Sequence, residues 1–133
     1  MAAISSPFLR KVLALDALAS GATGVLLAVA ADPLSGLLGL SPALMRSAGL
    51  FLVPYALLVA WMASRTTLPR SAVWAVVAVN TLWAVESVTL VAAGWVQPSI
   101  LGMFFICAQA AVVALFGLLQ FAALRQYRVS RAI

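Results

Sequence analysis

The chain has 133 residues, of which 65% are hydrophobic and 8% are charged, and it contains no histidine. A soluble domain is nearer half apolar and a quarter charged, so much of this apolar surface must face lipid. The lack of histidine excludes an imidazole base and a histidine-ligated metal site, and the single cysteine excludes an intramolecular disulfide. We therefore expect no cofactor, no metal site and no enzyme, because no nucleophile–base pair or metal constellation can be assembled.

Four apolar segments are long enough to cross a bilayer as helices, which takes about 20 residues each. They cover residues 12–31, 47–64, 71–94 and 99–124, and Asp32-Pro33 ends the first of them. The alternation typical of membrane strands is absent. The sequence therefore predicts an all-α fold with a single domain over residues 1–133, an integral membrane up-and-down four-helix bundle. Asp16 and the length of the first segment argue against a cleavable signal peptide.

The basic residues predict how this bundle is oriented. If the spans alternate in direction, seven of the eight fall on one side of the membrane: Arg10, Lys11, Arg65, Arg70, Arg125, Arg128 and Arg131. Arg46 alone falls on the other side. Because Lys and Arg are enriched in cytoplasmic loops, we expect both termini in the cytoplasm and the protein in a bacterial inner membrane. Basic residues that only flank apolar runs form no nucleic-acid patch, so the bilayer rather than nucleic acid is the expected partner.

Asp16 is the first of two acids inside the predicted spans. It lies about 9 Å inside the first span, and Ser20 and Thr23 follow on the same helix face. A charge near the bilayer centre costs at least about 2.5–3.5 kcal/mol, so the side chain should face the bundle interior. Two interpretations stay open. Asp16 is either a protonatable carboxylate that binds a cation or proton, or a structural carboxyl bonded to neighbouring helices, Gln120 or Arg65.

Glu86 is the second intramembrane acid, about 12 Å below the outer end of the third span. Asp16 and Glu86 approach the bilayer centre from opposite faces, so we do not expect them to form a carboxylate pair. The cation nearest to Glu86 in depth is Arg46, at the outer start of the second span. A long arginine side chain can reach inward, so we predict a direct or water-bridged Arg46–Glu86 ion pair.

Uncharged polar side chains, together with one tryptophan, are also spread over the predicted spans. Those singled out are Ser20, Thr23, Tyr55, Asn80, Trp83, Ser87, Gln109 and Gln120. One interpretation is an interhelical packing network, since Asn and Gln side chains commonly bond across membrane helices. The other is a small polar pocket inside the bundle, roofed by Trp83 and Tyr55.

Two further features bear on packing. The connection from Asp32 to Arg46 is rich in leucine, so we expect a short helical turn in the interface, either a simple cap or a lid over an outward-facing cavity. Small residues four apart on the first span, such as Ser20 and Gly24, permit close backbone approach. That approach could be inside the bundle or in a homodimer.

Short motifs across the chain carry a resemblance: Asp16-x-x-x-Ser20-Gly21-x-x-Gly24, Pro54-Tyr55-Ala56, Asn80-x-x-Trp83, Gln109-Ala110 and Leu119-Gln120. On these residues the chain resembles a family of small bacterial four-helix integral membrane proteins, and the resemblance implies no activity. The chain is also similar in length and span number to small multidrug resistance proteins, which carry one essential acid in the first helix. That family uses glutamate there, whereas this chain has Asp16, a second intramembrane acid and a much stronger orientation signal.

The leading hypothesis is therefore a binding or accessory protein. It would act through a homo-oligomer or a membrane protein partner, or through a small pocket for an apolar or cationic ligand. The alternative is a proton-coupled transporter of small molecules or cations that uses Asp16, with or without Glu86.

Overall fold

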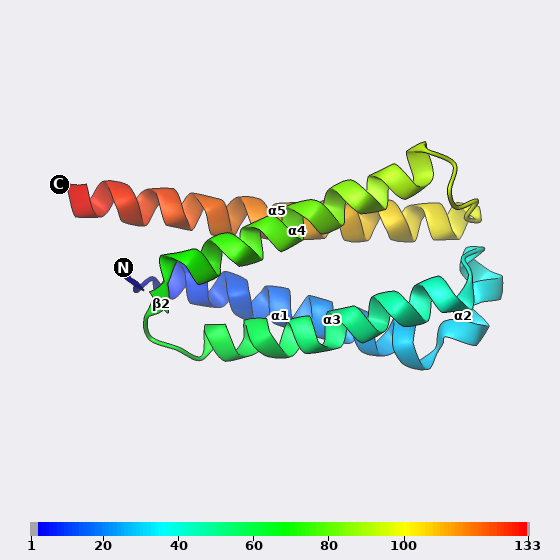
Figure 1. Ribbon diagram of the computed structural model, residues 1–133, viewed down its shortest axis with the longest axis horizontal. Coiled ribbons are helices and arrows are strands. Elements are labelled where there is room, and N and C mark those ends of the chain that lie inside the picture. The colour runs from blue at the N-terminus through cyan, green and yellow to red at the C-terminus, as the bar shows by residue number, and fades with distance from the viewer. Residues whose placement is uncertain (1–2, 133) are drawn as a thin grey trace.

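The computed structural model describes the backbone of residues 3–132 and the side chains of residues 3–127. This part of the chain forms five helices, drawn in Figure 1: α1 (Pro7–Val29), α2 (Ala31–Leu38), α3 (Pro42–Ala63), α4 (Arg70–Ala92) and α5 (Ile100–Ala132). Two short strands, β1 (Ala3–Ile4) and β2 (Leu68–Pro69), pair antiparallel. Helices α1, α3, α4 and α5 are each long and apolar enough to span a membrane, which confirms the expected all-helical class. The side chains of Arg128 and Arg131 lie outside the described residues.

Two of the long helices begin at a Ser-Pro pair. The Ser6 hydroxyl accepts a hydrogen bond from the Leu9 N–H at 3.2 Å, and the Ser41 hydroxyl accepts one from the Leu44 N–H at 3.1 Å. A proline follows each serine at the first helical position, where its missing N–H costs nothing. Helices α1 and α3 therefore begin at residues 7 and 42, earlier than the predicted residues 12 and 47, because hydropathy alone does not register these caps.

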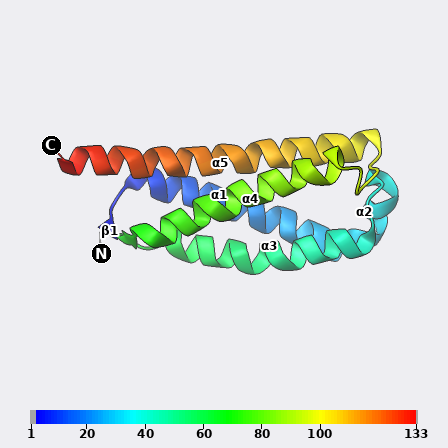
Figure 2. The ribbon, with the colours of Figure 1, turned by 45° about the horizontal axis from the view of Figure 1, so that its top comes forward.

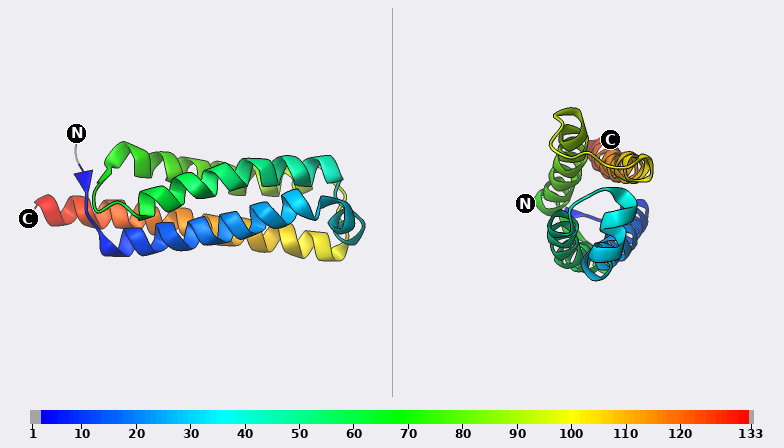
Figure 3. Two further views of the ribbon diagram at one scale, coloured as in Figure 1. Left: turned by 90° about the horizontal axis from the view of Figure 1, so that it is seen from below. Right: turned by 90° about the vertical axis from the view of Figure 1, so that its right-hand side faces the viewer.

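The four long helices are arranged as two pairs. Helix α1 packs along α3, and α4 packs along α5, while a smaller contact between α1 and α5 joins the pairs. The end-on view in Figure 3 shows the two pairs as separate layers. Both termini lie at one end of the molecule, and α2 lies at the other (Figure 1). We call these the terminal end and the α2 end.

Small residues bring α1 and α3 close together. A methyl group on Gly49 would lie 2.5 Å from the backbone oxygen of Gly24 and from the backbone nitrogen of Ala28. A methyl group on Gly24 would lie 2.8 Å from the Leu52 Cβ. Gly24 of the predicted small-residue pair therefore serves a contact inside the molecule.

Helix α2 occupies the connection where a helical turn was expected, and Ser99 fastens it to α5. The Ser99 N–H donates to the Leu38 carbonyl at 2.9 Å, and its hydroxyl donates to the Leu37 carbonyl at 2.8 Å. The same hydroxyl accepts from the Gly102 N–H at 3.1 Å, which caps the start of α5. One residue thus caps one helix and holds another, and it joins the two helix pairs at the α2 end.

The terminal end is held by a two-stranded ribbon and by arginine side chains that donate to backbone carbonyls. The β1–β2 ribbon covers it, the Arg10 side chain donates to the Ala63 carbonyl at 3.2 Å, and Arg70 donates to the Leu124 carbonyl at 3.4 Å. A buried apolar core lies at each end of the molecule: one around Leu13, the other around Leu27. Toward the α2 end, α4 runs away from α3, as Figures 1 and 2 both show.

Candidate functional site

Polar side chains from all four long helices meet between the two apolar cores. They are Asp16 and Ser20 on α1, Tyr55 on α3, Asn80 on α4 and Gln120 on α5, and we call them the Asp16 cluster. The side chains of Asp16 and Gln120 are fully buried, and Asn80 is 2% exposed. Because Ser20 lies one helical turn after Asp16, the two face the same side of α1.

Asp16 accepts every hydrogen bond that it makes within the cluster. Its Oδ2 accepts from the Asn80 amide at 2.9 Å and from the Gln120 amide at 2.8 Å, while its Oδ1 accepts from the Ser20 hydroxyl at 3.1 Å. Asn80 also donates to the Gln120 Oε1 at 2.9 Å and accepts from the Tyr55 hydroxyl at 2.9 Å. The five side chains therefore form one connected network across four helices.

Both carboxyl oxygens of Asp16 therefore act as acceptors in the cluster. Its donors are all neutral, and among the described residues no cation pairs with Asp16. Gln120 occupies the partner position expected for it. Arg65, the other partner considered, lies instead over the Trp61 ring, with its Cζ 5.4 Å from the ring centroid. The cluster satisfies Asp16 without a salt bridge.

A second network joins α4 and α5 nearer the α2 end. The Trp83 indole donates to the Gln109 Oε1 at 2.8 Å, and the Gln109 amide donates to the Ser87 hydroxyl at 3.0 Å. The polar set predicted from the sequence is thus divided. Gln109 and Gln120, which share a face of α5, belong to different networks, and Thr23 lines a cavity instead of joining the Asp16 cluster.

That cavity has a volume of about 600 Å³ and lies between the helix pairs at the α2 end. Most of its lining is aliphatic or aromatic, and α1, α3, α4 and α5 all contribute. Phe51 of α3 stacks on Trp83 of α4, with ring centroids 5.6 Å apart, and both line the cavity. Lining residues on α3 (Ser47, Phe51) and on α4 (Leu82, Glu86) are exposed, so the cavity opens sideways between these two helices.

Glu86 lines this cavity, and a direct ion pair with Arg46, one of the two predicted forms, is wrong. Arg46 pairs with Asp32 at 3.3 Å, and both side chains are exposed at the α2 end. Depth in the membrane alone does not identify Asp32 as a partner of Arg46, because the pair Asp32-Pro33 predicts the end of a helix. In fact α2 begins at Ala31, and this places Asp32 in its first turn, within reach of the start of α3. Among the described residues, no side chain bonds to or pairs with the Glu86 carboxylate.

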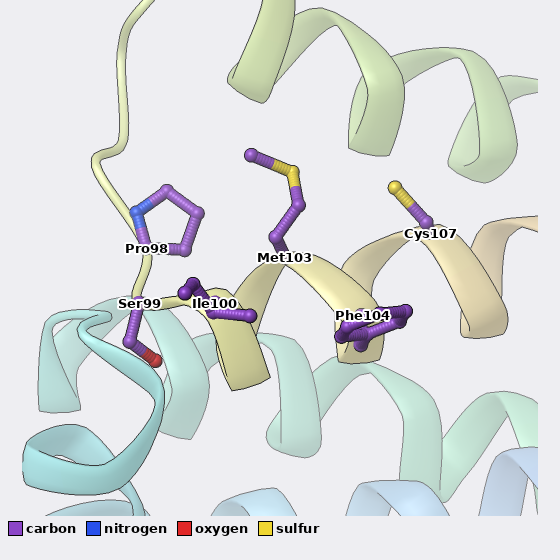
Figure 4. Close-up of a pocket in the computed structure, with 6 residues that line it drawn as sticks. All are labelled: Pro98, Ser99, Ile100, Met103, Phe104 and Cys107. Carbon is purple, nitrogen blue, oxygen red and sulfur yellow. The ribbon is translucent and has the colours of Figure 1, made fainter.

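A second, smaller depression of about 330 Å³ lies on the first turns of α5 and the loop before it. Figure 4 shows its lining residues, with Met103 and Cys107 pointing toward the side of α4. The Cys107 side chain is exposed. All the lining residues come from one segment and none is charged, so no polar groups from different helices converge there.

Some cavity residues were not singled out from the sequence, notably Ala48, Phe51 and Phe105. One signal was available: Phe51 precedes Tyr55 by four residues, so both rings lie on one face of α3, and their centroids are 6.1 Å apart.

Comparison of the chain with models of known protein families, with curated proteins and with solved structures found no match. The function is therefore argued from the two networks and the cavity.

Proposed function

We propose that this chain is a small multi-pass protein of the bacterial inner membrane that binds an apolar small molecule in the cavity between its helix pairs. The observation that carries the proposal is the cavity of about 600 Å³. Pockets that hold small ligands are usually about 300–1,000 Å³, mostly apolar, with a few polar groups that orient the ligand. The polar side chains of the lining come from Thr23, Ser47, Trp83, Glu86, Ser87 and Gln109, and the rest of the lining is apolar.

We further propose an up-and-down bundle with both termini in the cytoplasm. Arg10, Lys11 and Arg125 lie near the termini, and Arg65 and Arg70 flank the loop that returns to the same end (Figure 1). Arg46 lies at the α2 end, where it is paired with Asp32. This distribution supports a cytoplasmic terminal end, since positively charged loops are retained on the cytoplasmic side.

The accessory and transport hypotheses draw less support. The small residues of α1 are used inside the molecule against α3, so they do not favour a homodimer surface. Asp16 does not line the cavity, and each of its contacts in the cluster is a hydrogen bond to a protein donor. These contacts favour a structural role for Asp16 over transport chemistry.

The indole of Trp83 offers a direct test of binding. Its N–H is bonded to Gln109 and its ring lines the cavity, so a ligand there should shift its indole NMR signal. The protein would be labelled with ¹⁵N-tryptophan, placed in zwitterionic lipid nanodiscs and titrated with 2-tert-butylnaphthalene, a neutral apolar probe. We expect the Trp83 signal to shift and to saturate as the probe is added. The signals of the exposed Trp61, Trp74 and Trp95 should show no such saturation.

A cavity-filling variant supplies the control for this titration. Ala48 lines the cavity, so Ala48→Leu should weaken probe binding by occupying its space. Ala60 lies on the same helix with an exposed side chain, so Ala60→Leu should leave binding unchanged. A Trp83 shift that never saturates, or that is equal in all three proteins, would refute the proposed function.

A further inference from the structure

We propose that the ligand of this cavity is an organic monocation with apolar substituents, and that Glu86 selects it by supplying the opposing charge. This inference rests on the proposed function and names the chemical class that the site takes. The juxtaposition that carries it is a carboxylate without a described partner beside an aromatic pair, at the mouth of an otherwise largely apolar cavity.

The position of Glu86 makes its charge expensive. It lies six residues before the end of α4 at Ala92, about 9 Å along the helix from that end. Its side chain is exposed, and most of the cavity lining to which it belongs is apolar. In a bilayer this region is lipid, where an isolated charge is costly because no water solvates it. A cation bound in the cavity would offset that cost.

The rest of the cavity suits a cation with apolar substituents rather than a hydrated metal ion. A hard metal ion needs several oxygen ligands, and Glu86 is the one acid among the lining residues. An organic cation needs a single opposing charge, apolar contacts and, often, an aromatic face. Trp83 lies one helical turn before Glu86, on the same face of α4, and is stacked on Phe51. Indole and phenyl rings attract cations through their quadrupoles.

Asp16 does not compete for this role. It lies outside the cavity lining, is fully buried, and its carboxylate already accepts three hydrogen bonds from protein side chains. Asp32 is paired with Arg46 at the α2 end. Of the three acids in the chain, Glu86 is therefore the one that neither pairs with a described cation nor accepts a bond from a described donor.

The test compares two probes of the same shape, 2-naphthyltrimethylammonium and its neutral isostere 2-tert-butylnaphthalene. Both would be titrated against ¹⁵N-tryptophan-labelled protein in zwitterionic nanodiscs, with the Trp83 indole signal as readout. For each probe, binding is expressed relative to the amount dissolved in the lipid, so that partitioning cancels. We expect the cation to bind more tightly than the isostere. In Glu86→Gln the affinity for the cation should fall about tenfold or more, while that for the isostere stays the same.

Two further variants make the result specific. Asp32→Asn removes one negative charge from the α2 end without touching the cavity, so it should preserve the preference for the cation. Glu86→Asp keeps the charge and should retain most of that preference, which separates charge from folding defects. Equal binding of both probes to the unmodified protein, or equal weakening of both in Glu86→Gln, overturns the cation proposal while leaving the cavity as a binding site. Failure of the neutral isostere to give a saturable Trp83 shift overturns the proposed function itself.

Discussion

The Gln120 amide donates to the Asp16 carboxylate at 2.8 Å, across 104 residues of chain and between two helices that belong to different pairs. Asn80 donates to the same carboxylate oxygen from α4. Because α1 belongs to one pair and both amides to the other, this oxygen holds the two layers together in the middle of the molecule. One apolar core lies on either side of this contact.

Replacing Asp16 should therefore destabilise the fold to a degree that depends on the replacement. In Asp16→Leu the Ser20, Asn80 and Gln120 donors lose their acceptor, at a cost of about 1–3 kcal/mol for each donor that finds no new partner. Asp16→Asn keeps one acceptor oxygen and should cost about 1 kcal/mol, close to the value of one interhelical bond. Thermal unfolding in detergent measures both. Equal stability of Asp16→Leu and the unmodified protein would show that the cluster does not hold the layers together.

The close approach of α1 and α3 gives a second prediction. Gly49→Ala places a methyl group 2.5 Å from two backbone atoms of α1, so the helices must separate, at a cost of about 1–3 kcal/mol. Gly36→Ala is the matched control, because nothing lies within 4 Å of the added methyl and the helix gains up to about 1 kcal/mol. Unfolding curves of the two variants should move in opposite directions. If Gly49→Ala is as stable as Gly36→Ala, the tight α1–α3 packing is refuted.

Ser99→Ala tests the attachment of α2. The change removes a hydrogen bond to the Leu37 carbonyl and the cap on the Gly102 N–H, together worth about 1 kcal/mol or somewhat more. Faster backbone amide exchange is expected in α2, since one of the bonds that hold it to α5 is gone. Ser71→Ala changes an exposed position in the first turn of α4. In that variant, backbone amide exchange in α2 should equal that of the unmodified protein. Unaltered exchange in α2 of the Ser99 variant would argue that the backbone bond to Leu38 alone holds that helix.

The proposed orientation can be checked with single cysteines in a Cys107→Ser background. Thr66 lies in the exposed loop at the terminal end, and Gln97 lies in the exposed loop near the α2 end. A membrane-impermeant maleimide applied to intact spheroplasts should label Gln97→Cys and should label Thr66→Cys only after the membrane is opened. Labelling of Thr66→Cys in sealed spheroplasts would show that the orientation is opposite to the one proposed.

The elements of the fold could be predicted well because the apolar runs dominate the sequence. The four long helices fall where the runs lie, and Asp16 and Ser20 share a face because helical spacing alone puts them there. Gln120 could be proposed as a partner of Asp16 from depth, since both lie toward the cytoplasmic side of their predicted spans.

Depth along the membrane normal, however, does not say which helices are neighbours. Depth pairs Arg46 with Glu86, yet Arg46 pairs with Asp32, because α2 begins at Ala31 and carries Asp32 in its first turn. Gln109 and Gln120 share a helix face but meet different partners, since α4 presents Trp83 to one and Asn80 to the other. The cavity arises from the divergence of α4 from α3, a tertiary angle that no local pattern encodes.

The sideways opening between α3 and α4 has a consequence for how a ligand would reach the protein. If the four long helices span a bilayer as proposed, that opening would face the acyl chains, a ligand would enter after dissolving in the membrane, and occupancy would follow its mole fraction in lipid. A compound's partition coefficient then multiplies its apparent potency in water. Two compounds with the same contacts to Trp83 and Glu86 would need very different aqueous doses, and the membrane itself would act as the reservoir from which the site is filled.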